Sequence, residues 1–218
     1  MPLPEDTMFF GYADKLTEEQ KSYVDSIFDN QLTMVNAKSG SGKTTLAVAA
    51  AKLIGKELLY VFSPVEEGKM GFRPGSQRDK ESSYYQPLKD ALMEINENPD
   101  QVIYDENNLE RQKNGDFWVF PMSHIFARGT NIKNKTLIID EAQNFTKGEL
   151  KKLLTRVHST TTVIMIGHSE QNDLSNPNKS GFMPYIEWFK DEEYAFACEL
   201  SVNFRGKLAN HADKLSWA

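Results

Sequence analysis

The chain has 218 residues, of which 39% are hydrophobic and 26% charged, values that are ordinary for a soluble globular protein. This length suits one domain with a full core and also permits two small ones. The 25 basic and 31 acidic residues give a net charge of -6, which excludes a uniformly basic coat for nucleic acid but permits a local basic groove. No apolar run approaches the ~20 residues that cross a bilayer, so we expect no membrane partner.

The single cysteine, Cys198, lies in an apolar run and cannot form a disulfide within the chain. The N-terminus, with Pro2, Pro4, Glu5 and Asp6, lacks the pattern of a secretory signal. We therefore expect a cytoplasmic protein in which Cys198 is a buried structural thiol.

Taken in chain order, residues 1–16 are expected to form an irregular arm, and a helix then begins after Thr17. Thr17 and Gln20 have the spacing of a capping box. The Gln20 amide has two interpretations: it caps this helix only, or it reads both hydrogen-bonding edges of adenine beside a phosphate site. The apolar face of the helix is predicted to carry Tyr23, Val24, Ile27 and Phe28.

Residues 32–51 have the pattern of a phosphate-binding loop between a strand at 32–35 and a helix that begins at Lys43. They match G-x-x-x-x-G-K-[ST], with Ala37 in the first position. Gly40 and Gly42 let backbone N–H groups converge on phosphate oxygens, and the helix start adds the positive end of its dipole. Lys43 would reach the β- and γ-phosphates, and the Thr44 hydroxyl would hold Mg²⁺. The predicted nucleotide-binding residues are Ala37, Lys38, Ser39, Gly40, Ser41, Gly42, Lys43, Thr44 and Thr45, with Gln20 upstream.

A second buried strand is expected at 57–63, followed by a long insertion at 64–116. Its segment 69–85 is basic and contains Phe72, Tyr84 and Tyr85, a mixture that suits a path for single-stranded nucleic acid; a solvated connection is the alternative. A helix is expected at 87–95, and the acidic residues 100–110 are expected to lie away from the basic segment.

The next predicted strand, 117–120, leads to a short helix at 124–127, after which Arg128 could contact nucleotide, a neighbouring subunit or only solvent. The strand at 136–139 ends in adjacent carboxylates. Asp140 would orient Mg²⁺, and Glu141 would polarise the water that attacks the γ-phosphorus. The following helix, 147–157, has either a solvated basic face or a nucleic-acid contact; its cations are Lys147, Lys151, Lys152 and Arg156.

A buried strand is predicted at 161–167. If it lies between the phosphate-loop strand and the Asp140 strand, Gln171 is placed to sense the γ-phosphate, whereas His168 is a weaker candidate. An aromatic helix with Tyr185, Trp188 and Phe189 then leads to the last strand, 194–200. Beyond it, Arg205 is either an arginine finger, acting within the subunit or across an interface, or part of a surface salt bridge.

Together these motifs resemble the PhoH-like family, a branch of P-loop ATPases related to superfamily 1 helicases. The resemblance runs from about Thr17 to Leu215 and rests on residues 37–44, 63–68, 71–75, 85–92, 128–129, 139–144 and 167–174. Two positions depart from the family pattern: Ala37 replaces a glycine, and Gly167-His168 replaces a Gly-Asp pair at the sensor strand.

The resemblance implies a cytoplasmic ATPase with a single RecA-like core at 17–218, located in the host cytoplasm if it is encoded by a phage. Some relatives join this core to an RNA-cleaving or RNA-binding domain, and we expect no such domain within these 218 residues. Helicase-type ATPases place ATP between two RecA-like lobes. One lobe is expected here, so we expect a homo-oligomer, for example a ring, in which a neighbour supplies the missing half.

The predicted fold is therefore α/β, with a mainly parallel sheet flanked by helices and ATP at the carboxyl ends of its strands. The predicted function is Mg²⁺-dependent ATP hydrolysis coupled to single-stranded nucleic acid, RNA more than DNA, in a helicase-like manner. Lys43, Glu141, Gln171 and Arg205 would be catalytic, and Thr44 and Asp140 would hold the metal. Two alternatives remain open: a nucleotide-gated binding module with little hydrolysis, which His168 favours, and a small-molecule P-loop kinase, which would usually carry an arginine-rich lid.

Overall fold

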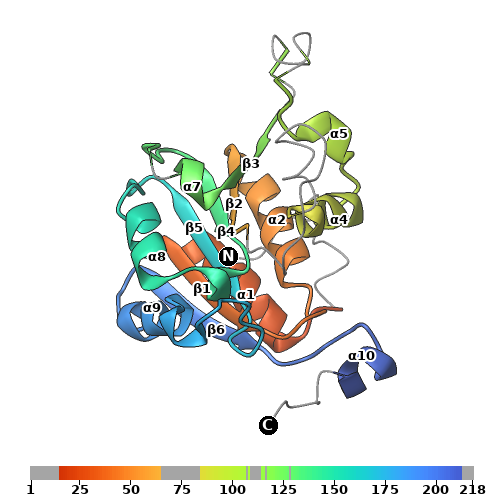
Figure 1. The fold of residues 1–218 in the computed structure, drawn as a ribbon. Helices are drawn as coiled ribbons and strands as arrows, with labels where there is room; N and C mark the ends of the chain where they lie inside the picture. The colour runs from red at the N-terminus through yellow and green to blue at the C-terminus, as the bar shows by residue number, and fades with distance from the viewer. Residues whose placement is uncertain are drawn as a thin grey trace.

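The computed structural model describes residues 15–64, 84–106, 108, 114–115, 117–127 and 129–212 (Figure 1). Nearly all of the expected arm at 1–16 lies outside these residues, as do Arg128 and residues 69–83 of the basic segment. The described parts of the insertion at 64–116 carry two helices and lead into a strand of the main sheet.

Six strands of the described chain form one sheet in the order β3-β2-β4-β5-β1-β6, and every neighbouring pair is parallel. The prediction of an α/β fold with a parallel sheet is confirmed. β5 lies between the phosphate-loop strand β1 and the Asp140 strand β4, which is the condition on which the placement of Gln171 depended. The strands are β1 Leu32–Ala37, β2 Leu58–Phe62, β3 Val119–Ser123, β4 Thr136–Ile139, β5 Thr162–Gly167 and β6 Ala195–Leu200.

Helices cover both faces of the sheet, so the fold has three layers (Figure 1). One hydrophobic cluster joins the sheet to α1, α2 and α4, and a second joins the opposite face to α7, α8 and α9. None of the described helices is both long and apolar enough to span a membrane. The helices are α1 Glu18–Asp29, α2 Lys43–Ile54, α4 Gln86–Glu94, α5 Pro99–Val102, α7 His124–Ala127, α8 Lys147–Leu154, α9 Phe182–Phe189 and α10 Lys207–Ala212, with short 3-10 turns η1 Ala142–Asn144 and η2 Pro177–Lys179.

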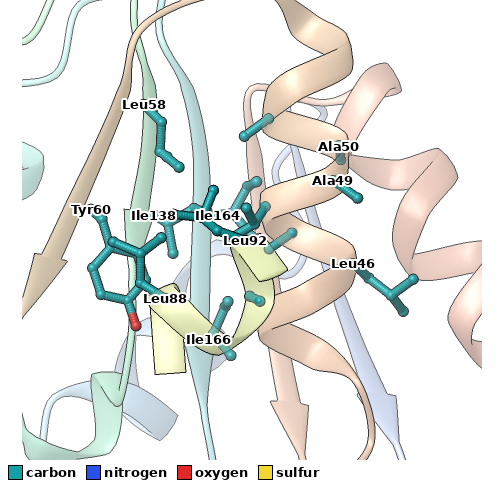
Figure 2. Close-up of a cluster of buried hydrophobic side chains, with 14 of the residues drawn as sticks. Leu46, Ala49, Ala50, Leu58, Tyr60, Leu88, Leu92, Ile138, Ile164 and Ile166 are labelled. Atoms are coloured by element: carbon teal, nitrogen blue, oxygen red, sulfur yellow. The ribbon is translucent and has the colours of Figure 1, made fainter. Parts of the chain in front are cut away.

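The strands are apolar almost throughout because successive side chains enter opposite cores. In β2, Tyr60 and Phe62 join the cluster under α2 and α4, whereas Leu59 and Val61 join the other cluster. Figure 2 shows Tyr60 on the sheet beside Leu88 of α4, with the tyrosine hydroxyl at the rim of the apolar cluster. This alternation puts the Tyr60 ring on the face covered by α2 and α4, and its hydroxyl reaches Asp140 at the end of β4.

The structure corrects the predicted start of β3, the predicted end of α8 and the predicted apolar face of α1. β3 begins at Val119 rather than at 117, because Trp118 donates its backbone N–H to Val102 ahead of the strand. α8 ends at Leu154 rather than at 157, since the Thr155 hydroxyl bonds back to Lys151 and Val157 instead forms a bridge with Ile132. On α1, Phe28 is 39% exposed, and the buried positions include Ser26.

Candidate nucleotide-binding site

The phosphate loop has the geometry that its glycines predict. β1 ends at the buried Ala37, and α2 begins at Lys43 after a turn in which Gly40 and Gly42 have φ values of 71° and 81°. These left-handed conformations are costly for residues with a Cβ. Ala37 is accommodated because its position is ordinary strand and requires no such conformation.

A cavity of about 470 Å³ opens at the carboxyl ends of the strands, above the phosphate loop. It brings together Lys43, Thr44, Glu141, Gln171 and Arg205, which come from four separate parts of the sequence. Gln20, Ser39, Gly40, Gly42 and Thr45 also line it, whereas Ala37, Lys38, Ser41 and Asp140 do not. Ser41 is buried beneath the loop.

Asp140 lies behind the cavity wall, buried at the end of β4. The Thr44 hydroxyl is 3.4 Å from Asp140 Oδ2, and the Glu141 backbone N–H donates to Oδ1 at 2.9 Å. Tyr60 of the neighbouring strand β2 also donates its hydroxyl to Oδ2. Burial, followed by the charge of Asp140, raises the pKa of Tyr60 well above its usual range, so that the hydroxyl stays a donor.

The pairing of Thr44 with Asp140 fits Mg²⁺. Hard cations prefer oxygen ligands, and Mg²⁺ in nucleotide sites is held by one or two protein groups together with phosphates and water. The described residues contain no cluster of three or more acidic, histidine or cysteine side chains that could hold a metal alone. A site shared with bound phosphates is therefore the arrangement that these two residues can support.

Glu141 has a strained backbone, with φ at 50°, a left-handed conformation that is uncommon outside glycine and concentrated at functional sites. Its carboxylate accepts a hydrogen bond from Gln143 Nε2, while Gln143 Oε1 accepts the backbone N–H of His168 at 2.9 Å. Burial, and then the neighbouring charge of Asp140, raise the pKa of Glu141, whereas Lys43 opposes the shift. A carboxylate of raised basicity facing the cavity suits a general base.

The loop after β5 is tied to the phosphate-loop strand. The Asn36 side chain accepts the Ser169 backbone N–H at 3.0 Å and donates to its hydroxyl at 3.2 Å. Gln171 follows and lines the cavity. His168 is buried and does not line the cavity, and its role as a weaker sensor candidate stays a prediction.

Gln20 makes the predicted capping box, in which its Oε1 accepts the Thr17 backbone N–H at 3.0 Å. Its Nε2 also donates to the Ser41 carbonyl at 2.9 Å, which ties α1 to the phosphate loop. The amide therefore lies at the cavity wall in a fixed position, and its adenine contact stays a prediction.

The segment after β6 crosses directly over the phosphate loop. The Phe204 N–H donates to the Gly40 carbonyl at 2.9 Å, and Arg205 Nη1 donates to the Ser39 hydroxyl at 2.7 Å. Arg205 thus lies at the phosphate loop of its own chain, and it forms no ion pair within the described residues. Asn203 Oδ1 accepts the Arg205 backbone N–H at 2.8 Å and fixes the turn.

Several cavity residues were not predicted. Phe204 lines the cavity with 55% of its surface exposed, and its position next to Arg205 was the available signal in the sequence. Pro87, Asp90 and Glu94 of α4 also line the cavity. Pro87 and Asp90 lie in the stretch 85–92 that carries the family resemblance, but nothing in the sequence places this stretch beside the phosphate loop; the packing of α4 on α2 does so. Tyr60 was likewise read only as a core strand residue.

The basic segment is only partly described, and its two tyrosines are used in packing. Tyr85 is buried in the core, and the ring of Tyr84 stacks on Phe62 with centroids 6.0 Å apart. The burial of Tyr85 argues against its predicted stacking on a base, whereas the same role for the half-buried Tyr84 stays a prediction. Phe72 and the other residues 69–83 lie outside the described residues.

The sequence model of the family described as PhoH-like protein matches residues 13–212. The chain belongs to the PhoH-like protein family. A PhoH-like protein of Synechocystis is 35% identical over 191 residues, which are 85% of this chain and 56% of that protein. Protein PhoH of Escherichia coli is 32% identical over 183 residues, 81% of this chain and 49% of that protein. This PhoH-like chain thus spans about half the length of these relatives.

Solved structures show which fold this PhoH-like chain shares. The UvsW helicase of bacteriophage T4 aligns with a TM-score of 0.54 and 10% identity over 88% of this chain and 66% of that one. The large terminase of the thermophilic bacteriophage D6E aligns with a TM-score of 0.56 and 10% identity over 90% of this chain and 49% of that one. At this identity the likeness shows the fold alone, which is a RecA-like P-loop NTPase core.

Proposed function

We propose that this PhoH-like chain binds ATP with Mg²⁺ and hydrolyses it, and that hydrolysis is coupled to single-stranded nucleic acid, RNA more than DNA. One observation supports the proposal most: Lys43, Thr44, Glu141 and Gln171 face one cavity, with Asp140 directly behind it. A kinase would need a second pocket for its acceptor and a lid. In contrast, Glu141 and Gln171 are groups that suit a water molecule as acceptor.

In the proposed site, the loop backbone and Lys43 hold the β- and γ-phosphates, and the metal supplies charge neutralisation when bound. Thr44 and Asp140 are the residues that would hold that metal. Glu141 accepts a proton from the attacking water, and its raised pKa makes it a stronger base than an exposed glutamate. Gln171 orients the same water or contacts the γ-phosphate.

The chemistry of the cavity residues suggests which of them contact the adenine ring and the ribose. Phe204, half-exposed in the cavity, suits stacking against the adenine ring, and Gln20 suits its hydrogen-bonding edge. Asp90 and Glu94 would repel phosphate and are better matched to ribose hydroxyls. Arg205 contributes positive charge from the same chain, although an oligomer in which a neighbour closes the open cavity is also part of the proposal.

The test is steady-state ATP hydrolysis by the wild type and Glu141→Gln, each with and without single-stranded RNA and DNA. Nucleotide binding is measured in parallel by equilibrium titration. We expect Glu141→Gln to lose turnover and keep binding, and we expect one polymer to raise wild-type turnover. Binding without turnover in the wild type would contradict hydrolysis and favour a nucleotide-gated module. Turnover indifferent to both polymers would contradict the coupling alone.

A further inference from the structure

A groove of about 630 Å³ lies between α8 and α9, on the face of the sheet opposite α1 and α2. It shares no lining residue with the nucleotide cavity. Its walls combine two lysines, Lys147 and Lys151, with three aromatic side chains, Tyr185, Trp188 and Phe189. The groove is large enough for a small ligand or a short segment of polymer.

The aromatic wall presents one ring largely to solvent. Tyr185 and Phe189 are half-buried and stack on each other with centroids 5.9 Å apart and planes 23° apart. Trp188 beside them is 77% exposed, although tryptophan is usually well buried in folded proteins. A flat, exposed indole next to a groove therefore offers a stacking surface that the fold itself does not use.

The opposite wall is positively charged in a chain whose net charge is -6. Lys147, Lys151 and Lys152 are exposed on α8, and within the described part of the chain none of them forms an ion pair. None of the described residues that line the groove is acidic. By contrast, Lys190, which follows α9 directly, is already paired with Glu187 at 2.7 Å. The groove is thus complementary to an anion.

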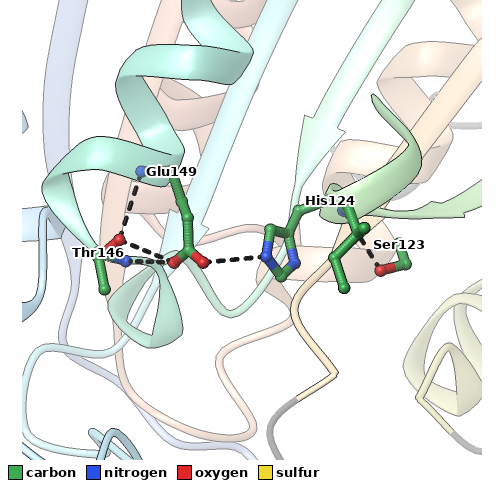
Figure 3. Close-up of polar contacts among 5 residues, drawn as sticks. Ser123, His124, Thr146 and Glu149 are labelled. Atoms are coloured by element: carbon green, nitrogen blue, oxygen red, sulfur yellow. Dashed lines mark hydrogen bonds and ion pairs between the residues drawn. The ribbon is translucent and has the colours of Figure 1, made fainter. Parts of the chain in front are cut away.

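The two walls are held in fixed relative positions. The capping box of Thr146 and Glu149 defines the start of α8, and His124 Nε2 lies 3.1 Å from the same carboxylate (Figure 3). Burial would raise the pKa of Glu149, but the hydrogen bonds from Thr146 and the contact with His124 outweigh it and lower that pKa. Gly181 then brings α9 against α8, since a Cβ there would lie 2.9 Å from the Lys147 backbone.

We propose that the groove binds single-stranded nucleic acid, with phosphates at Lys147 and Lys151 and a base stacked on Trp188. This ligand has the two features that the groove pairs, repeated negative charge and flat apolar rings. An acidic peptide would satisfy the lysines but carries no flat ring at each repeat. The inference rests on the proposed nucleic-acid coupling and adds to it a surface other than the basic segment 69–85.

The groove is also connected to the residues that face the γ-phosphate. α8 follows the turn after Glu141, and α9 follows the loop that contains Gln171. Asn144 and Asp173 join these two loops by reciprocal hydrogen bonds of 3.1 and 2.8 Å. A change at the phosphate end therefore has a direct physical route to both walls of the groove.

The test is fluorescence anisotropy with labelled oligouridylate and oligothymidylate of about 15 nucleotides, a length that covers one site on most single-strand binders. Each titration is run with and without Mg²⁺ and a non-hydrolysable ATP analogue. Loss of one stacked base predicts that Trp188→Ala weakens the affinity about 5- to 160-fold, whereas Trp188→Phe keeps most of the affinity. Lys147→Ala combined with Lys151→Ala should lower the slope of log affinity against log salt by roughly 1.4, since each phosphate contact contributes about 0.7.

Lys152→Ala is the matched control, because Lys152 lies on the same helix outside the groove and its loss should change affinity much less. Wild-type binding that Trp188→Ala and the double lysine variant leave unchanged would overturn the groove assignment and leave the nucleic-acid coupling standing. No oligonucleotide binding by a wild type that hydrolyses ATP would overturn both the groove and the coupling, but not the ATPase. The native masses of the wild type, Trp188→Ala and the double lysine variant are compared by light scattering. If these variants differ in mass from the wild type and still bind the oligonucleotides, the groove would be assigned to a second copy of the chain.

Discussion

Replacing Gly40 by alanine is expected to destabilise the protein by more than backbone strain alone. Gly40 has φ at +71°, and an added Cβ would lie 2.6 Å from Arg205 Cγ and 2.6 Å from Asn203 Oδ1. Gly55, at the end of α2, has φ at +72° with nothing within 4 Å of the added Cβ. Gly55→Ala is therefore a matched control that has the same backbone conformation and lacks the clash.

The magnitudes follow from these two environments. The left-handed conformation costs an alanine about 1–2 kcal/mol at either position. Overpacking against Asn203 and Arg205 adds about 1–3 kcal/mol at Gly40 only. Gly40→Ala should thus unfold at lower urea concentration than Gly55→Ala, with a difference of about 1–3 kcal/mol in the free energy of unfolding.

Nucleotide affinity provides a second measurement on the same pair. Relief of the clash requires residues 203–205 to move away from the phosphate loop, so Gly40→Ala should bind ATP more weakly, whereas Gly55→Ala should bind it as the wild type does. Equal unfolding free energies and equal ATP affinities for the two variants would refute the packing argument.

Three further predictions concern polar groups that are wholly or partly buried. Tyr60→Phe should lower the free energy of unfolding by about 1.5–3 kcal/mol, because the buried Asp140 carboxylate loses a hydroxyl donor while the ring is kept. An unchanged urea midpoint would contradict this role for Tyr60. The folded protein raises the pKa of Glu141 above its usual value of 4.5, so ionisation of this carboxyl opposes folding once the pH rises above 4.5. Glu141→Gln removes this cost, and it should therefore stabilise the protein at neutral pH but not below pH 4.5. An equal gain in the free energy of unfolding above and below pH 4.5, measured by urea titration, would argue against the ionisation of Glu141 as its cause. Cys198 is partly rather than fully buried, and this burial raises its pKa to about 12. A disulfide reagent at mildly alkaline pH should therefore react with it much more slowly than with an exposed thiol, and reaction at the rate of a free thiol would contradict the raised pKa.

The features that the sequence determined by itself are those whose residues are neighbours in the chain. The phosphate loop, the carboxylates at the end of the Asp140 strand and the capping box at Thr17 depend on local backbone geometry and on side-chain spacing. The apolar runs likewise predicted buried strands of a parallel sheet, since a strand covered on both faces has no polar side. The departures occurred at element ends, where Trp118 and Thr155 form bonds that periodicity does not encode.

The tertiary structure alone decided which distant residues meet at the carboxyl ends of the strands. Parallel strands expose the same edge, but the strand order determines the neighbours along that edge, and this order depends on long-range packing. It brings the Tyr60 hydroxyl to Asp140, lays Asn203 and Phe204 across Gly40, and buries Tyr85 where the sequence suggested a stacking ring. It also leaves Trp188 exposed beside the lysines of α8, because neither the aromatic helix nor the basic helix shows in its own sequence which of its sides the other will face.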